Sequence, residues 1–409
     1  MRMEPYDSDE LPGNATIDLY PAEFYRTGAP HSAWRRLRAE APVWQQLAPD
    51  GTPFWSVTRY DDVLGVLRDA EHFTSEHSTM LSVLQGDPEA GKAINLIDGR
   101  GHRSLRTSGM RHLSASRVRD REPIVRPLMT GLVDAVAGRG EVDLVRELTV
   151  LPMLAAADII GLPREHWDDL SRWTMAGVAP EDPTLARGSG PETLMLAHLE
   201  LLTCFSELLA KRRAQPADDL VSALGAAELE GRPLTDEEVM INVYAFTMGA
   251  AITTPQIIHH LVLVMAEQPL LWERVTASGD ADLLLDEALR WATPTNHLLR
   301  LVTQDVVLGG QPVRKGDLVA AWVGSANRDE SVFEDPFRFD PWRAHNPHLA
   351  FGFGPHFCIG AHAARVGLRL VIEELMKRVV RFELTGPVQH LASNFVNGVV
   401  RLPVVVHAR

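Results

Sequence analysis

The sequence has little cysteine: Cys204 and Cys358 are the two in 409 residues. Two cysteines cannot build a disulfide framework, so this composition indicates a reducing compartment. Positive charge is also scarce, because 40 Lys and Arg residues stand against 54 Asp and Glu residues, for a formal net charge of -14. An acidic chain repels phosphate backbones and anionic lipid. We therefore expect neither nucleic acid nor a membrane surface as a partner.

The sequence also lacks an uninterrupted apolar run of membrane-spanning length, and residues 1–14 are polar and rich in Asp, Glu, Pro and Gly. A secretory signal would instead begin with positive charge followed by an apolar stretch. These absences favour a soluble, cytoplasmic protein. The 45% of residues that are hydrophobic suffice to bury a large core. Length alone suggests two or three domains, and one large α-rich domain is the alternative.

Helical periodicity dominates the chain from Tyr60 to about Val275. Thr235 and Glu238 form a capping box that opens a helix to about Ala266. That segment is apolar on most faces, so we expect it to run through the core. Strand-like patterns occupy 43–57, 299–323 and 391–407, and the first and last have the pattern of hairpins. The predicted fold class is mainly α with a small β portion.

Residues 351–360, which read FGFGPHFCIG, deliver one cysteine to the start of an expected helix. A helix N-terminus favours the thiolate form of Cys358. A thiolate ligand pushes electron density into a haem iron and promotes O–O cleavage. Gly352 and Gly360 would let the backbone approach a flat macrocycle closely, and His356 can reach a haem propionate.

Other interpretations of this segment remain open. A lone cysteine is usually a small buried hydrophobic residue. His356, Cys358 and His362 suggest zinc, but a structural zinc site needs four ligands and no second cluster is evident. The glycine pattern suggests a dinucleotide loop, but the required strand does not precede it.

The segment resembles the haem-binding signature of cytochromes P-450, with Phe351, Gly354, His356, Cys358 and Gly360 in the expected places. The resemblance implies the cytochrome P-450 fold as one domain over residues 1–409, with 1–19 poorly ordered and the long central helix over the haem. It implies haem b as cofactor, with Cys358 as the iron ligand. The implied protein is a monomeric monooxygenase that hydroxylates or epoxidises a hydrophobic, natural-product small molecule with O2.

A second landmark is Glu287-Ala-Leu-Arg290, whose two charged residues share a helix face and can pair. Taken singly, such a pair is usually a solvated surface pair. In the resembled family it joins an arginine of a later loop, and Arg338 matches that arginine. The resemblance therefore implies a structural role for Glu287, Arg290 and Arg338 in fixing the cysteine loop.

A third landmark is the pair His102 and Arg106, four apart on one helix face, where the two side chains can grip one anion. The plain alternative is an exposed basic face. In the family the matching residues bind haem propionates, together with residues that correspond to Arg300 and His356. Several cations around two carboxylates are chemically expected.

The central helix departs from the family pattern of Ala/Gly-Gly-x-Asp/Glu-Thr-Thr, because residues 247–255 read TMGAAITTP. The family's acid and alcohol help to deliver protons during oxygen activation. Alignment on Thr253 and Thr254 puts Thr253 at the alcohol and Ile252 at the acid. Alignment on Gly249 puts Ala251 at the acid and Ile252 at the alcohol. The acid is missing in both cases. Either water or a substrate hydroxyl replaces it, or the reaction is atypical: peroxide-using, or an oxidative coupling or cyclisation.

The resemblance also implies a mostly apolar substrate pocket, although many of its residues can equally be plain core. It consists of Met80, Leu84, Trp173, Val178, Met248, Ala250, Asn296, His297, Leu298, Phe395 and Val396. No flavin or iron–sulfur domain is evident, so we expect electrons from a ferredoxin or flavodoxin with its reductase. A basic patch behind the cysteine would dock such an acidic partner. Its expected members are Arg103, Arg111, Arg343, His345, His348 and Arg369. A haem-bound sensor or carrier is the alternative from another functional class.

Overall fold

The structure, a computed structural model, describes residues 17–27 and 30–409. The prediction of a poorly ordered segment at 1–19 therefore falls mainly outside the described residues. Leu19, by contrast, is fully buried, and its N–H donates to Gln46 Oε1 at 2.8 Å.

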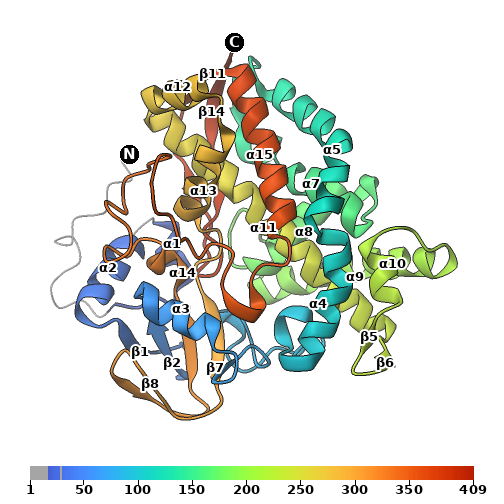
Figure 1. The fold of residues 1–409 in the computed structure, drawn as a ribbon, viewed down its shortest axis with the longest axis vertical. Coiled ribbons are helices and arrows are strands. Elements are labelled where there is room, and N and C mark those ends of the chain that lie inside the picture. Colours follow the sequence, from blue (N-terminus) through green and yellow to red (C-terminus); the bar gives the residue numbers. More distant parts are fainter. Residues whose placement is uncertain (1–16, 28–29) are drawn as a thin grey trace.

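Helices make up most of the described chain, which confirms the predicted mainly α class (Figure 1). They are α1 Ala22–Arg26, α2 Pro30–Glu40, α3 Tyr60–Arg68, α4 Gly99–Leu113, α5 Ala115–Val136, α6 Leu144–Glu147, α7 Leu151–Ile160, α8 Trp167–Val178, α9 Gly190–Ala214, α10 Leu220–Gly225, α11 Asp236–Glu267, α12 Pro269–Ser278, α13 Ala281–Ala292, α14 Val323–Ala326 and α15 Ala361–Arg378. Short 3-10 turns occupy Leu81–Val83 (η2), Ile94–Leu96 (η3), Arg164–His166 (η4) and Gly354–His356 (η5).

The central helix α11 begins at the predicted capping box, in which Thr235 Oγ1 accepts the N–H of Glu238 and Glu238 accepts the N–H of Thr235. Its 32 residues span roughly 48 Å at 1.5 Å per residue. The helix packs against α7, α8, α9, α13 and β11, and in Figure 1 it runs behind α15. Helix α11 therefore lies at the centre of the helical part of the protein, and the other helices pack around it.

The strands form small sheets beside the helices. They are β1 Val43–Leu47, β2 Pro53–Val57, β3 Phe73–Thr74, β4 Glu141–Asp143, β5 Glu228–Leu229, β6 Arg232–Pro233, β7 Leu298–Val302, β8 Val306–Leu308, β9 Gln311–Val313, β10 Leu318–Ala321, β11 Val379–Leu384, β12 Gln389–His390, β13 Val399–Arg401 and β14 Pro403–Ala408. Five of them form a sheet in the order β1-β2-β10-β7-β3, and three form another in the order β11-β14-β4.

The two predicted hairpins have different outcomes. Strands β1 and β2 pair antiparallel with Val43 opposite Val57, and Gly51 supplies a positive φ of 85° between them. The hairpin predicted at 391–407 is wrong: β13 pairs with β12, whereas β14 pairs with β11 and β4. Only residue 402 separates β13 from β14, which is too short for a two-residue hairpin turn.

Helices α9 and α11 are long and apolar enough to cross a membrane by length and composition alone. In α11, 83% of the apolar window is buried inside the protein, as befits a core helix. In α9 that share is 39%, and Met195, Leu199 and Leu202 are exposed.

Candidate functional site

The loop that carries Cys358 is shaped by glycines with positive φ. Gly352 has φ 67° and Gly354 has φ 72°, and a Cβ at Gly354 would lie 2.6 Å from the backbone oxygen of Leu67. Only glycine fits there, because both the conformation and the space exclude a side chain. The Cys358 N–H donates to Phe351 O at 2.8 Å, which closes the loop immediately before α15.

Burial raises the pKa of the Cys358 thiol, and this outweighs the lowering by the backbone hydrogen bond from Gly360 and the charge of Arg106. The prediction that the start of α15 lowers this pKa is therefore not met by the protein's own groups. A coordinated metal ion removes the proton from a thiol outright, so the ligand role does not require a low intrinsic pKa. The chain supplies a positioned thiol with two neighbours that favour its anion.

The pair Glu287–Arg290 is not a surface pair, because the side chains are 1% and 0% exposed. Arg290 donates to Glu287 through Nη2 at 2.6 Å and Nε at 2.8 Å, and to Pro336 O at 2.9 Å. The prediction that Arg338 is the later arginine that joins this pair is wrong. Its side chain is exposed, and it contributes only its carbonyl to Arg290, at 3.3 Å.

Arg343 is the arginine that completes this network, with its Nε 3.3 Å from Glu287 Oε2 and its side chain 8% exposed. The N–H of Asp340 also donates to Glu287, at 2.9 Å. Paired and hydrogen-bonded buried charges of this kind hold a loop in one arrangement. The network fixes residues 336–346, which lead directly into the cysteine loop.

A cluster of basic side chains meets beside the cysteine loop. His102 and Arg106 lie on α4, Arg300 lies on β7, and His356 lies on η5. The rings of His102 and His356 have centroids 4.2 Å apart. The structure therefore brings together, from three separate elements, the four basic side chains that the sequence predicts, and burial with the charges of His356 and Arg106 lowers the pKa of His102 to about 4.

His356 is held by a carboxylate that sequence reasoning missed. Its Nε2 lies 2.6 Å from Asp98 Oδ1, and Asp98 Oδ2 accepts the N–H of Ser75 and the hydroxyl of Thr74. Burial alone would raise the pKa of Asp98, but these hydrogen bonds lower it to about 2. The available signal was an acid directly before α4, in the N-cap position.

Arg300 is buried at 3% exposure, and its Nη1 donates to Leu299 O at 2.8 Å. Burial lowers its pKa to about 10, against a smaller opposing effect of the charge of Asp98. Among the described residues, no carboxylate forms an ion pair with Arg300 or with Arg106. A buried, unpaired cation is costly unless an anion meets it. This cluster of basic side chains, with Arg300 and Arg106 as its unpaired charges, fits a flat group that carries two carboxylates, as haem b does.

On α11 the segment 249–253 presents a short open face beside buried residues of the same helix. Gly249 is exposed, Ala250 and Thr253 are partly exposed, and a Cβ at Gly249 would meet no atom within 4 Å. The Thr253 hydroxyl donates to Gly249 O at 2.8 Å. Ile252 and Thr254 are buried at 4% and 7% exposure. This geometry favours the alignment that puts Thr253 at the alcohol position.

Ala251 is buried at 2% exposure and packs away from Ile252, in a different apolar cluster. Ile252 belongs to a second cluster with Met248 and Val396, against which Val178 and Phe395 pack. Four residues of the predicted substrate pocket are thus brought together around Ile252.

The other predicted pocket residues lie elsewhere or carry structural bonds. Leu84 packs in the cluster around Trp34, and Trp173 packs against the cluster of α7 and α9. His297 is fully buried, with Nε2 accepting the N–H of Leu81 at 3.1 Å and Nδ1 lying 3.0 Å from Asn394 O. Burial lowers the pKa of His297 to about 4, so it is neutral.

Asn296 is buried, and its N–H donates to Phe395 O at 2.7 Å. Met80 and Leu298 are partly exposed, and a Cβ at Gly352 would lie 3.9 Å from Leu298 Cδ1. Leu298 therefore borders the cysteine loop.

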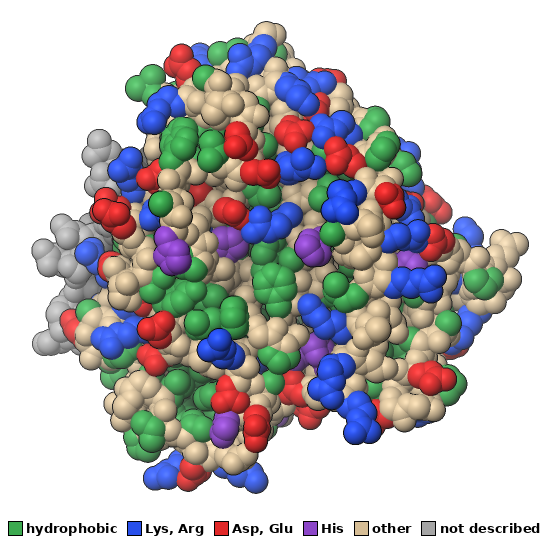
Figure 2. All heavy atoms as spheres, in the orientation of Figure 1, with side chains coloured by type: hydrophobic (Ala, Val, Ile, Leu, Met, Phe, Trp, Pro, Cys, Tyr) green, Lys and Arg blue, Asp and Glu red, His purple; other side chains and the backbone are tan. Residues whose placement is uncertain are grey.

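The expected basic patch is smaller than the sequence suggests. Arg343 is taken by Glu287, His348 lies 3.6 Å from an oxygen of Asp286, and Arg369 pairs with Glu122. Arg103, Arg111 and His345 remain exposed. Figure 2 shows acidic and basic side chains interleaved on the face in view, so the charge there is mixed.

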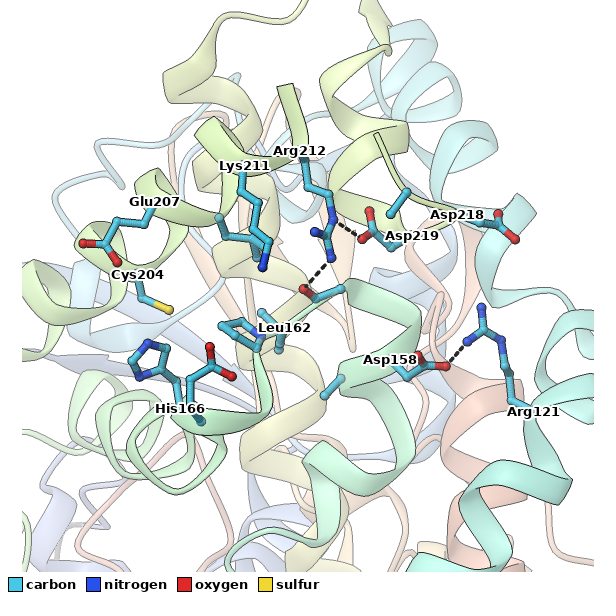
Figure 3. A pocket seen from close by; sticks show the side chains of 16 residues that line it. Arg121, Asp158, Leu162, His166, Cys204, Glu207, Lys211, Arg212, Asp218 and Asp219 are labelled. Atoms are coloured by element: carbon cyan, nitrogen blue, oxygen red, sulfur yellow. Dashed lines mark hydrogen bonds and ion pairs between the residues drawn. The ribbon is translucent and has the colours of Figure 1, made fainter. Parts of the chain in front are cut away.

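A separate cavity of about 490 Å³ lies between the end of α7, α9 and the loop before α10 (Figure 3). Two pairs of its charged residues meet: Arg121 pairs with Asp158, and Arg212 pairs with Asp219. Cys204 also lines it, and burial raises the pKa of that thiol to about 11. None of its lining residues comes from the cysteine loop, and we assign it no function.

Comparison with known proteins shows which family this chain resembles in sequence. The profile of the cytochrome P450 family matches residues 281–403. Linalool 8-monooxygenase of Pseudomonas putida is 34% identical over 401 residues, covering 95% of this chain and 98% of that protein. Cytochrome P450 NovI of Streptomyces niveus is 33% identical, covering 91% of each chain.

Solved structures agree. P450 OxyD, involved in the biosynthesis of vancomycin-type antibiotics, has a TM-score of 0.86 and 31% identity, covering 96% of this chain and all of that one. Mycobacterium marinum CYP268A2, in complex with pseudoionone, has a TM-score of 0.88 and 30% identity, covering 96% and 98%. The chain therefore belongs to the cytochrome P450 family, the haem b-binding oxidoreductases.

Proposed function

We propose that this enzyme hydroxylates or epoxidises a hydrophobic, natural-product small molecule, in the cytoplasm, as one catalytic domain over residues 1–409. The observation that carries the proposal is the apolar cluster around Ile252, which lies beside the open face of α11 at Thr253. Haem b bound through a thiolate supplies oxygen activation and oxygen insertion. The electrons come from a separate ferredoxin or flavodoxin with its reductase.

The chain's own residues divide the remaining work. Cys358 is the iron ligand, and the network of Glu287, Arg290 and Arg343 fixes the loop before it. Arg300 and Arg106 would neutralise the two carboxylates of the cofactor, and the rings of His102 and His356 would hydrogen-bond to them. These side chains would also orient the cofactor, because they come from three different elements.

Thr253 holds a proton at the open face of α11. Its hydroxyl donates to Gly249 O, which leaves its oxygen lone pairs free to accept from a water molecule or a substrate hydroxyl. Protons then arrive through such a molecule, since the residue before Thr253 is an isoleucine. This keeps ordinary hydroxylation available without the missing acid.

The relatives support a small apolar substrate. The names of two of them give linalool and pseudoionone as the molecules on which they act or which they bind. Both are small, apolar molecules, and either would suit the cluster of Val178, Met248, Ile252, Phe395 and Val396.

One observation favours an atypical reaction as second candidate. Ile252 is buried at 4% exposure, and it packs with Met248, Val396 and the other apolar side chains of its cluster. A carboxylate at this position would be buried against apolar side chains, where its charged form is costly. In that candidate the enzyme uses peroxide, or couples or cyclises its substrate.

The test is the oxidation of linalool under ¹⁸O₂ with NADH, a bacterial ferredoxin and its reductase, compared with hydrogen peroxide alone. The proposal predicts one ¹⁸O atom in the product and turnover that depends on the ferredoxin. Equal or faster turnover with peroxide, or product without ¹⁸O, would instead support the atypical reaction.

A further inference from the structure

One face of α11 carries a row of apolar side chains that ends in a polar group. Tyr244, Met248 and Ile252 follow each other at four-residue spacing, so they lie on the same side of the helix. All three pack with Val178 and Phe395. Among the described residues of this cluster, Tyr244 alone has a side chain that forms hydrogen bonds.

The Tyr244 hydroxyl lies where α8, α9 and α11 meet. His198 Nε2 of α9 lies 3.1 Å from it, and the two rings meet edge to face at 85° with centroids 5.6 Å apart. A Cβ at Gly177 of α8 would lie 3.4 Å from the hydroxyl oxygen and 3.5 Å from Met248 Cε. Gly177 therefore lets α8 approach this pair closely, while Tyr244 and His198 both stay partly exposed.

Both partners are neutral near pH 7. Burial raises the pKa of Tyr244 well above its ordinary value, and the charges of Asp87 and Glu89 contribute to that rise. Burial lowers the pKa of His198. The pair therefore offers neutral hydrogen-bonding groups, and the nearby carboxylates make its surroundings unfavourable for an anion.

The hydrogen bond between Tyr244 and His198 leaves each side chain able to form another one. If Tyr244 donates to His198, its oxygen still accepts and the other ring nitrogen of His198 still donates. If His198 donates, the Tyr244 hydroxyl hydrogen stays free. In both cases a third molecule can be bound through a donor or an acceptor, which suits a hydroxyl or a carbonyl group.

We infer that the Tyr244–His198 pair anchors a neutral hydroxyl or carbonyl group at the far end of an elongated apolar substrate, an inference that rests on the proposed function. Tyr244 and Ile252, which directly precedes Thr253, lie eight positions apart on one side of α11, which corresponds to about 12 Å along the helix. That length is spanned by roughly ten carbon–carbon bonds of about 1.5 Å in a zigzag chain. The substrate class is thus a terminally oxygenated chain of about this length, attacked at its opposite end, and free acids are disfavoured.

The test is calorimetric titration of the ferric holoenzyme with 1-decanol, 1-chlorodecane and decanoic acid. The wild type should bind 1-decanol about tenfold more tightly than 1-chlorodecane, the value of one good hydrogen bond, and more tightly than decanoate. Tyr244→Phe should bring 1-decanol to the affinity of 1-chlorodecane and leave 1-chlorodecane unchanged. His198→Leu should reduce the same preference from the other side of the pair.

Tyr25→Phe is the matched control, because it removes a buried hydroxyl that donates to Leu19 O at 2.8 Å in another part of the molecule. It should keep the preference for 1-decanol. The inference is overturned if Tyr244→Phe keeps the preference, if it weakens all three ligands equally, if decanoate binds best, or if the wild type binds no 1-decanol. These readings need no turnover, so a failure of the proposed oxidation would appear separately, as an intact preference without product.

Discussion

Replacing Arg300 with methionine should have opposite effects on the protein without cofactor and on the loaded protein. Burial lowers the pKa of Arg300 from its ordinary value to about 10. A depressed pKa of a base means that the folded chain holds the charge at a cost, here about 3 kcal/mol at 1.36 kcal/mol per unit. At pH 7 the arginine is charged in both the folded and the unfolded state, so this cost is present in full.

We therefore expect Arg300→Met to leave the apoprotein as stable as the wild type or to stabilise it by up to about 3 kcal/mol. In the haem-loaded protein the same change leaves a buried carboxylate of the haem without its cationic partner, which costs about 2–5 kcal/mol of haem-binding free energy. Haem affinity should fall by about thirtyfold or more. Urea unfolding of the apoprotein and the rate of haem transfer to apomyoglobin measure the two effects.

Arg328→Met is the matched control. Arg328 is equally buried, but it donates to Arg290 O at 2.9 Å and Trp291 O at 2.7 Å. Its loss leaves Trp291 O without this donor, whereas Arg290 O keeps the Thr293 hydroxyl, so the change should destabilise the apoprotein by about 1–3 kcal/mol. The reasoning is refuted if Arg300→Met destabilises the apoprotein as much as Arg328→Met does while haem transfer keeps its wild-type rate.

Three further predictions follow from the buried charges. Arg343→Ala should lower the free energy of unfolding by about 3–5 kcal/mol because it breaks a buried pair, whereas Arg338→Ala should change it by less than about 0.5 kcal/mol; equal losses in urea titrations would contradict the network. Ile252→Asp should lower Tm, because it buries a carboxylate among apolar side chains, and should not improve the coupling of electron use to product; better coupling at unchanged Tm would be evidence against this. Burial holds the pKa of His259 and of His260 at about 3, with His390 adding to the shift of His260. Their folded pKa values lie below the unfolded value of about 6.5, so stability is full above pH 6.5 and falls between pH 6.5 and about 3, by about 1.4 kcal/mol per pH unit for each histidine. Unfolding free energies that stay constant from pH 7 to pH 5 would contradict this.

Much of the fold and of the candidate site could be predicted from local motifs and their order along the chain. The capping box at Thr235, the glycine loop before Cys358 and the pair Glu287–Arg290 are each defined within a few residues. Local patterns of this kind follow from helix capping, backbone conformation and side-chain spacing.

The parts that sequence reasoning missed depend on distant contacts. Arg338 and Arg343 differ little in sequence context, and only the packing shows that Arg343 is buried against Glu287. Asp98 meets His356 across 258 positions. The pairing of β14 with β11 and β4 likewise depends on the tertiary arrangement, as does the raised pKa of Cys358, which comes from burial.

The central claim is that Cys358 is the thiolate ligand of the haem iron, and the carbon-monoxide difference spectrum of the reduced protein tests it most directly. The wild type should show the strongly red-shifted Soret band that thiolate ligation produces. Cys204→Ser, which removes the cysteine at the separate cavity, should keep that band, and Cys358→Ser should lose it. A wild-type spectrum without the red shift, or a Cys358→Ser protein that retains it, would contradict the claim.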